Sequence, residues 1–232
     1  MDGFFLVDKP EGMTSHDVVA RIRRLLKTRV GHAGTLDPMA TGLLLIGVGN
    51  GTKALGTLTK LPKTYEAEVT LGATSDTDDR EGRIQATENR NQRTGEQPTR
   101  GSVESALQRM TGTVQQTPPT YSAIKIRGVP AYRRMRRGES VTLSPREITV
   151  YTAELLSYAY PVARMRWVVS SGTYVRSLAR DLGEKLGTGA YLSALRRTTI
   201  GSFRVEEATP LSILAVKDLH PLETLDKIHD SR

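Results

Sequence analysis

The stretch 31–42 reads Gly31-His32-Ala33-Gly34-Thr35-Leu36-Asp37-Pro38-Met39-Ala40-Thr41-Gly42 and is the most informative part of the 232-residue chain. It contains three glycines and one acid, and it lies between a basic helical pattern and the apolar run 43–48. Glycines let a ligand approach the backbone closely, which is typical of a functional loop. A plain Asp-Pro turn, in which Asp37 only caps neighbouring amides, explains the same composition. The loop alone does not choose between these interpretations.

N-terminal to this loop, the sequence predicts a strand followed by an amphipathic helix. Gly3 to Val7 reads as a short strand, and Thr14 and Asp17 have the spacing of a capping box. The helix that starts there has an apolar face and a cationic face. These faces comprise Val18, Val19, Ile22, Leu25 and Leu26, and Arg21, Arg23, Arg24 and Lys27, respectively. Such a cationic row is most often a solvated face and only sometimes a nucleic-acid contact.

C-terminal to the loop, strands and helices interleave without a regular βαβ rhythm. From Tyr65 to Leu71 apolar and polar residues alternate, which predicts a half-buried strand. Further strands are expected at 148–160 and 165–169, and helices at 103–110 and 174–186, the last closed by Gly187. Residues 74–100 are rich in polar residues, which predicts a loop that is flexible without a ligand. This order favours an α+β fold with a mixed sheet, built as a single domain over residues 1–232.

The turn 47–53 reads Gly47-Val48-Gly49-Asn50-Gly51-Thr52-Lys53 and has the glycine content of a phosphate-binding loop. Such a loop ends in Gly-Lys-Ser/Thr, whereas this turn ends in Gly51-Thr52-Lys53. A tight turn before a helix is therefore favoured over nucleotide binding. A nucleotide-dependent enzyme is the weaker rival, and thermal stabilisation by ATP or GTP with magnesium would support it.

The run 170–176 reads Ser170-Ser171-Gly172-Thr173-Tyr174-Val175-Arg176 and predicts a strand that turns through Gly172 into a helix. Arg176 then falls in the first helical turn, where the helix dipole disfavours a cation. It therefore needs a partner. A carboxylate gripped by the planar guanidinium is one such partner, with Asp37 as a candidate, and solvent or another acid is the alternative.

The charge balance favours a polyanionic partner. Lysine and arginine number 33 against 25 acids, which gives a net charge of +8 at pH 7. A second basic stretch comprises Lys125, Arg127, Arg133, Arg134, Arg136 and Arg137. We place phosphate contacts at Arg133 and Arg134, by hypothesis. Tyr132, which lies among these arginines, either stacks on a base or packs beneath the helix.

Composition also bounds the classes of site. Cysteine is absent and the four histidines are scattered, so neither a disulfide nor a metal site is expected. No apolar stretch approaches the ~20 residues of a membrane span, and the N-terminus is unlike a signal peptide. The chain is therefore expected to be cytoplasmic.

Taken together and in order, these runs resemble the TruB family of tRNA pseudouridine synthases. The resemblance extends over residues 3–222. Besides the 31–42 loop, it rests on Lys9-Pro10, Gly12, Thr14-Ser15, Lys63-Thr64-Tyr65, Pro118-Pro119-Thr120-Tyr121-Ser122-Ala123-Ile124-Lys125, Gly172-Thr173-Tyr174-Val175-Arg176-Ser177-Leu178 and Leu195-Arg196-Arg197. Several motifs at family-like spacing are far more specific than any one of them.

The resemblance implies a pseudouridine synthase fold, which is a mixed, mainly antiparallel sheet with flanking helices and a central RNA-binding cleft. It implies that Asp37 is the catalytic aspartate, that Arg176 pairs with it, and that Tyr65 stacks on the target base. The substrate-binding residues that it implies are His32, Tyr174, Leu195 and Lys9. His32 would hold the disrupted RNA loop open, whereas without the resemblance it reads as a buried histidine bonded to the backbone.

The implied substrate is uridine 55 in the TΨC stem-loop of tRNA, extruded from its stack and bound by a monomer. No cofactor is expected, because the isomerisation involves neither a redox change nor phosphoryl transfer. Bacterial members usually carry a C-terminal PUA-type module, and with an end at Arg232 the chain is expected either to lack it or to be a shortened form. The main rival is a non-catalytic RNA-binding or RNA-folding protein on the same fold, which would have no use for the set Asp37, Tyr65 and Arg176.

Overall fold

The structure is a computed structural model that describes residues 1–87 and 97–224. Its contacts divide the chain into two compact units. The first unit comprises residues 1–66 with the described residues from 195 onward, and the second comprises the described residues of 67–194. The expectation of one catalytic domain over 1–232 stays a prediction.

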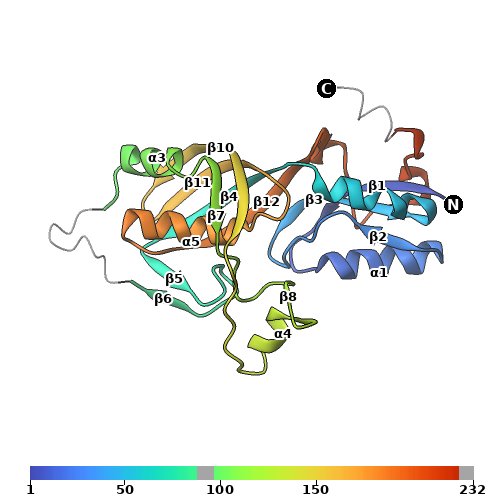
Figure 1. Ribbon diagram of the computed structural model, residues 1–232. Helices are drawn as coiled ribbons and strands as arrows, with labels where there is room; N and C mark the ends of the chain where they lie inside the picture. Colours follow the sequence, from blue (N-terminus) through green and yellow to red (C-terminus); the bar gives the residue numbers. More distant parts are fainter. Residues whose placement is uncertain (88–96, 225–232) are drawn as a thin grey trace. The chain divides into compact units, whose positions relative to one another are not determined.

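The first unit is built around the strand order β14-β1-β3-β12-β4. Of these strands, β1, β3, β4 and β12 are labelled in Figure 1. Its elements are β1 (Gly3–Lys9), α1 (Ser15–Leu26), β2 (Val30–His32), β3 (Thr41–Val48), η1 (Gly49–Lys53), α2 (Leu55–Lys60), β13 (Phe203–Arg204), η2 (Val205–Glu207), β14 (Thr209–Pro210) and η3 (Val216–Asp218). Two strands, β4 (Lys63–Leu71) and β12 (Ala190–Ile200), have residues in both units. β1 is antiparallel to β3, whereas β12 is parallel to β3, so the sheet is mixed.

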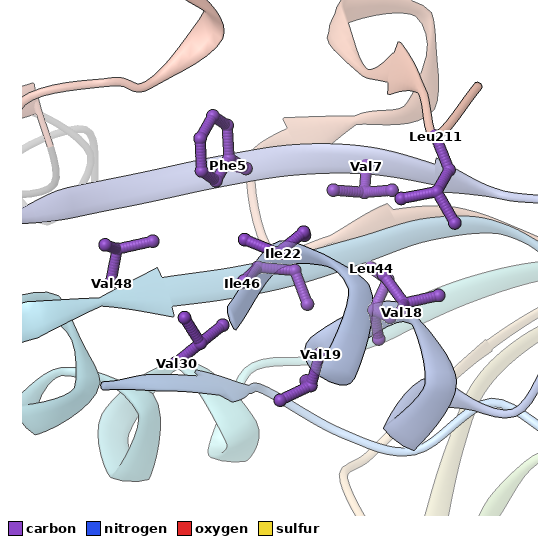
Figure 2. Close-up of a cluster of buried hydrophobic side chains, with 10 residues drawn as sticks. All are labelled: Phe5, Val7, Val18, Val19, Ile22, Val30, Leu44, Ile46, Val48 and Leu211. Atoms are coloured by element: carbon purple, nitrogen blue, oxygen red, sulfur yellow. The ribbon is translucent and has the colours of Figure 1, made fainter. Parts of the chain in front are cut away.

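The helix α1 begins at the predicted capping box. Thr14 Oγ1 accepts from the Asp17 amide at 3.1 Å, and Asp17 Oδ2 accepts from the Thr14 amide at 2.9 Å. Figure 2 shows the buried face of α1 packed on the strands, in a cluster of Phe5, Val7, Val18, Val19, Ile22, Val30, Leu44, Ile46, Val48 and Leu211. Each buried aliphatic side chain contributes about 1.5–3 kcal/mol, so this cluster fixes the start of α1 against β1 and β3. Leu25 is an exception to the predicted apolar face, since it is 54% exposed in the last turn, beyond the cluster.

The second unit has the strand order β12-β4-β11-β10-β7 and two separate two-stranded sheets, β5-β6 and β8-β9. Its further elements are β5 (Ala73–Ser75), β6 (Ile84–Ala86), α3 (Arg100–Gln108), β7 (Gly112–Gln116), β8 (Lys125–Ile126), β9 (Val129–Pro130), α4 (Ala131–Met135), β10 (Arg146–Ala159), β11 (Val162–Val169) and α5 (Val175–Leu186). β10 is antiparallel to both β11 and β7. The predicted alternation along β4 is confirmed, because residues 65, 67, 69 and 71 are buried and their neighbours are half-buried.

The predicted elements of the second unit are found within a few residues of their expected bounds. Helix α5 ends at Gly187, which adopts φ +70° as a left-handed C-terminal cap. Helix α3 ends at Gln108, two residues before the buried Met110 that the helical spacing included. The expected loop at 74–100 contains the β5-β6 pair, and its residues 88–96 lie outside the described residues. Together, the interleaved helices and mixed sheet confirm the α+β class.

Residues 124–143, here called the arginine subdomain, have an apolar cluster of their own. Ala131, Val141 and Leu143 are buried, and Ile124, Ile126 and Met135 pack against them. This small core holds α4 and the β8-β9 pair together. Across the described ranges, no helix is both long and apolar enough to cross a membrane.

Candidate active site

The loop that carries Asp37 connects two paired strands of the first unit. β2 is antiparallel to β3, and the Ala33 amide continues the pairing by donating to Leu45 O at 2.9 Å. The chain then leaves the sheet until Thr41, where β3 begins. Within this excursion the Ala40 amide donates to Asp37 O at 3.1 Å, so the backbone of Asp37 closes a turn as the Asp-Pro sequence predicts. The Asp37 side chain is half-buried.

Three contacts tie this loop to the segment between β1 and α1. The buried Ser15 hydroxyl accepts from the Leu36 amide at 2.8 Å and donates to Leu36 O at 3.2 Å. The Gly12 amide donates to Pro38 O at 2.9 Å. Lys9 is fully buried, and its Nζ donates to Pro38 O at 3.3 Å and to Met13 O at 2.6 Å. Residues on both sides of Asp37 are therefore fixed by the N-terminal segment.

Three basic side chains, His32, Lys63 and Arg197, lie near the start of the same loop. His32 is half-buried, and burial together with the charge of Arg197 lowers its pKa, so the imidazole is neutral at pH 7. Lys63 is 5% exposed, and its Nζ donates to Thr59 O and Leu61 O. Burial and, second, Arg197 lower the pKa of Lys63 to about 8. The sequence did not predict that Lys63 and Arg197 are buried beside the loop that carries Asp37.

Tyr65 and Leu195 lie on neighbouring strands of the first unit, β4 and β12. Both side chains are buried, each at 7% exposure. The two strands are joined near Tyr65 by the hydroxyls of Thr199 and Thr64, which lie 2.7 Å apart. Tyr65 and Leu195 are thus held on a sheet rather than on loops.

In the second unit, the N-terminus of α5 presents Tyr174 and Arg176. Tyr174 is the N-cap residue and supplies no side-chain cap. Instead, the buried side chain of Gln116, from β7, bonds to the backbone of Tyr174. Its Oε1 accepts from the Tyr174 amide at 2.8 Å, and its Nε2 donates to Tyr174 O at 3.0 Å. A single amide therefore fixes the backbone of Tyr174. Gln116 was not predicted, because nothing local in the sequence links it to residue 174.

Arg176 is 5% exposed and has an acidic neighbour, as its place in the first turn predicts. Its Nε lies 3.6 Å from Asp79 Oδ2, while Nη1 donates to Thr77 O and Nη2 to Tyr121 O, both at 3.1 Å. Asp79 is itself 3% exposed and accepts from Thr77 Oγ1 at 2.6 Å. Asp37 belongs to the first unit and Arg176 to the second, so their pairing stays a prediction.

Asp79 escaped sequence analysis because it lies in the polar stretch 74–100, whose composition predicts a loop. The acid-rich run Asp76 to Asp79 was the available signal, but it is also typical of a solvated turn. A second ion pair supports this turn, because Arg180 Nη1 lies 2.9 Å from Asp78 Oδ2. Burial raises the pKa of Asp78, and the charges of Arg180 and then Arg176 oppose that rise.

The two arginines predicted to contact phosphate lie on α4 and differ in their surroundings. Arg133 is exposed, and its Nε donates to the Tyr132 hydroxyl at 3.2 Å. Arg134 is half-buried, and its Nη1 lies 2.6 Å from Glu139 Oε2. The guanidinium carbons of Arg133 and Arg136 lie 5.9 and 5.6 Å from the centre of the Tyr132 ring, within cation–π range. Within the residues that the structure describes, no cluster of His, Asp and Glu is arranged to hold a metal.

Comparison with known families decides the identity of this fold. A model of the TruB family pseudouridylate synthase N-terminal domain matches residues 23–175, and a model of the tRNA pseudouridylate synthase B C-terminal domain matches residues 176–228. The chain belongs to the TruB family of pseudouridylate synthases. The N-terminal match includes Asp37 and Tyr65, and the C-terminal match begins at Arg176.

Curated relatives of this TruB-family chain are named tRNA pseudouridine synthase B. The protein from Thermobifida fusca is 48% identical over 93% of this chain and 75% of its own length. Those from Arthrobacter sp. strain FB24 and Mycobacterium bovis BCG are 44% and 47% identical, over 96% and 92% of this chain and 73% and 72% of their own lengths.

Solved structures share the fold over nine-tenths of this chain. A Cbf5-Nop10-Gar1 complex contains a chain that is 30% identical and matches with a TM-score of 0.69. The match covers 90% of the present chain and 52% of the chain in the complex. An H/ACA RNP bound to a substrate RNA containing 2′-deoxyuridine contains one with 28% identity and a TM-score of 0.66, of which this chain spans 51%. These similarities confirm a pseudouridine synthase fold, and pseudouridine synthases are isomerases.

Proposed function

We propose that this TruB-family chain isomerises uridine 55 in the TΨC stem-loop of tRNA to pseudouridine, with Asp37 as the catalytic carboxylate. The naming of the 44–48% identical relatives supports tRNA as the substrate. The observation that carries the proposal is the segment 34–43, here called the loop 34–43, which includes the first three residues of β3. In this loop Asp37 is half-buried and the residues around it are fixed by buried side chains. A binding protein has no need for an acid on a rigid loop, because a carboxylate repels the phosphates of RNA.

The reaction breaks the N1–C1′ glycosidic bond, rotates the uracil and joins C5 to C1′. The proton on C5 is lost and N1 regains one, so there is no net change in composition. The Asp37 carboxylate acts either by covalent addition or by stabilising the cleaved intermediate. In the proposal the target uridine is extruded, Tyr65 stacks on the base, and Tyr174 and Leu195 line the uracil pocket.

The remaining predicted residues have supporting roles in this proposal. His32, which is neutral at pH 7, fills the space that the extruded base leaves. Arg176 pairs with Asp37 and orients its carboxylate, while Asp79 and two carbonyls hold the guanidinium in place. Lys9 acts indirectly, since its ammonium donates to Met13 O and, within the loop, to Pro38 O. The chain works as a monomer in the cytoplasm and without a cofactor in this proposal.

The decisive experiment replaces Asp37 by Asn and follows tritium release from a tRNA transcript labelled at C5 of uridine. We expect a loss of at least about 10³-fold in single-turnover rate, because the nucleophilic or charge-stabilising group is removed. Affinity for tRNA should stay within a few-fold of the wild type. Glu147→Gln, on the exposed face of β10, is the matched control that removes one carboxylate elsewhere. Equal loss of turnover and affinity in Asp37→Asn would favour the RNA-binding alternative.

Arg176→Lys tests the pairing. Lysine keeps the charge but loses the planar fork that Thr77 O and Tyr121 O now hold, so we expect turnover to fall by about 100-fold. The same assay, run at saturating tRNA, measures this fall. Near-normal turnover would remove Arg176 from the catalytic set.

A further inference from the structure

We propose that Arg197 is a positioning residue that sets the distance between the two ends of the loop 34–43 and so the place of Asp37. This inference rests on the proposed role of Asp37. Arg197 is 1% exposed, at the parallel junction of β12 with β3. Its Nε donates to Leu43 O at 2.7 Å, and its Nη2 donates to Gly34 O at 3.1 Å. Gly34 follows β2 and Leu43 is the third residue of β3, so these two carbonyls lie on either side of the excursion that carries Asp37.

The shape of guanidinium explains why such a group suits this role. Its nitrogens are held in one plane by delocalisation, so two carbonyls bonded to Nε and Nη2 are kept at a fixed separation. A lysine ammonium is a single point charge on a flexible stem and cannot impose that separation. Among the described residues, Arg197 forms no ion pair with an acid, so its charge is met by the carbonyl dipoles of the loop.

The backbone of Arg197 restrains the same loop a second time. Arg197 is the register partner of Gly42, which adopts φ +101°. A Cβ at Gly42 would lie 2.3 Å from Arg197 O and 2.8 Å from Arg197 N, closer than real contacts allow. β3 can therefore pair with β12 at this place only through a glycine. Gly34, at the other end, also has a positive φ of +89°.

A plain packing role would not need this residue. Burying a charged group is costly unless it is hydrogen-bonded, and an apolar side chain could fill the same volume. The neighbouring Lys63 makes the cost larger, because burial and the charge of Arg197 lower its pKa. Arg197 is thus retained at a place that disfavours cations, and its two hydrogen bonds converge on the loop that carries Asp37.

The neighbouring Arg196 shows the contrast along one strand. Its side chain is 41% exposed, and it grips Asp8 through two bonds of 3.1 and 2.8 Å. It is an ordinary half-exposed ion pair, of the kind that contributes little to stability. Of these two adjacent arginines, only Arg197 donates from its guanidinium to Gly34 O and Leu43 O.

The test combines Arg197→Lys with amide hydrogen exchange and single-turnover tritium release. We expect exchange of the Leu36 and Ala40 amides to accelerate by about 10-fold or more, while the β1 and β3 amides keep their protection. Turnover should fall by about 100-fold, because a misplacement on the order of 1 Å costs that much, with tRNA affinity within about 3-fold of the wild type. Arg164→Lys, an exposed strand arginine paired with Glu68, is the matched control and should change neither.

Two results would overturn the proposal. One is near-normal turnover in Arg197→Lys, and the other is uniformly faster exchange across β1 and β3, which indicates a role in global stability alone. If the variant does not fold, the wild type decides: Leu36 and Ala40 must exchange as slowly as the β3 amides, and fast exchange there excludes a clamped loop. Asp37→Asn separates the two hypotheses, because it should lose turnover while its loop exchange stays normal.

Discussion

The loop 34–43 and the arginine subdomain use cations in opposite ways. Around the loop, Lys9, Lys63 and Arg197 are each at most 5% exposed, and all donate to backbone carbonyls. In the arginine subdomain the cations are mostly exposed, and Arg134 has a carboxylate partner, Glu139. Each region is compact, but the first buries its charge and the second displays it.

The difference indicates what each region needs to do. Burying a cation costs free energy, and here each buried cation fixes backbone carbonyls. Exposed cations on long side chains stay hydrated and so cost little free energy, and they attract a polyanion without a fixed geometry. Chemistry requires the first arrangement, because reacting groups must be placed to within a fraction of an ångström. Affinity for phosphates requires the second.

The largest effect is expected from Gly42→Ala, compared with Gly138→Ala in the arginine subdomain. Both glycines have positive φ, +101° and +75°, so both alanines are strained by about 1 kcal/mol. A Cβ at Gly138 meets no atom within 4 Å, whereas at Gly42 it collides with the Arg197 backbone. We expect Gly42→Ala to lower the free energy of unfolding by at least ~3 kcal/mol and to abolish turnover.

Urea unfolding and tritium release measure both effects. Gly138→Ala should lose only the strain and keep its turnover. Similar destabilisation by the two alanines would show that the loop 34–43 is no more rigid than the arginine subdomain. This result would contradict the proposed difference between the two regions.

Local patterns were read correctly from the sequence because their causes are local. The capping box of Thr14 and Asp17, the alternation from Tyr65 to Leu71 and the stop at Gly187 each depend on neighbours within a few residues. The need of Arg176 for a partner could also be predicted, because the helix dipole acts within one turn.

The environment of the buried cations could not be predicted. Arg197 bonds to Gly34 O, 163 residues away along the chain, and such a contact depends on how β12 meets β3. A Leu-Arg-Arg sequence does not say which arginine faces inward. Asp79 was missed for the same reason, since its partner Arg176 lies on a helix in a distant part of the sequence.

An intermediate effect is expected from pH, through Lys63. Its pKa is lowered from 10.5 to about 8 in the folded chain, so above pH 8 the unfolded chain binds more protons. The contribution of Lys63 to stability is therefore constant below pH 8 and rises with pH up to about 10.5, by roughly 3 kcal/mol. Urea unfolding at pH 7 and pH 10 should show this rise in the wild type and a smaller one in Lys63→Met. The same rise in both proteins would show that Lys63 is not the buried group that titrates.

The smallest effect is expected from the displayed cations. Arg133→Ala should weaken tRNA binding by about 3- to 10-fold and lower the slope of log K against log salt by about 0.9, as for one lost phosphate contact. Arg134→Ala should change the slope less, because Arg134 Nη1 is already paired with Glu139 Oε2 at 2.6 Å. Binding assays across a salt series measure both.

Arg100→Ala is the control for this series, since Arg100 is an exposed arginine on α3 that pairs with Glu104. It lowers the net charge by the same amount as Arg133→Ala, so an equal change in slope in both would mean that general charge, and not a contact at α4, attracts the tRNA. Turnover at saturating tRNA should be unchanged in all three variants, because none of them touches the loop 34–43. A fall in that turnover for Arg133→Ala would instead give the arginine subdomain a part in the chemistry, and the separation between a region that buries its charge and a region that displays it would no longer hold.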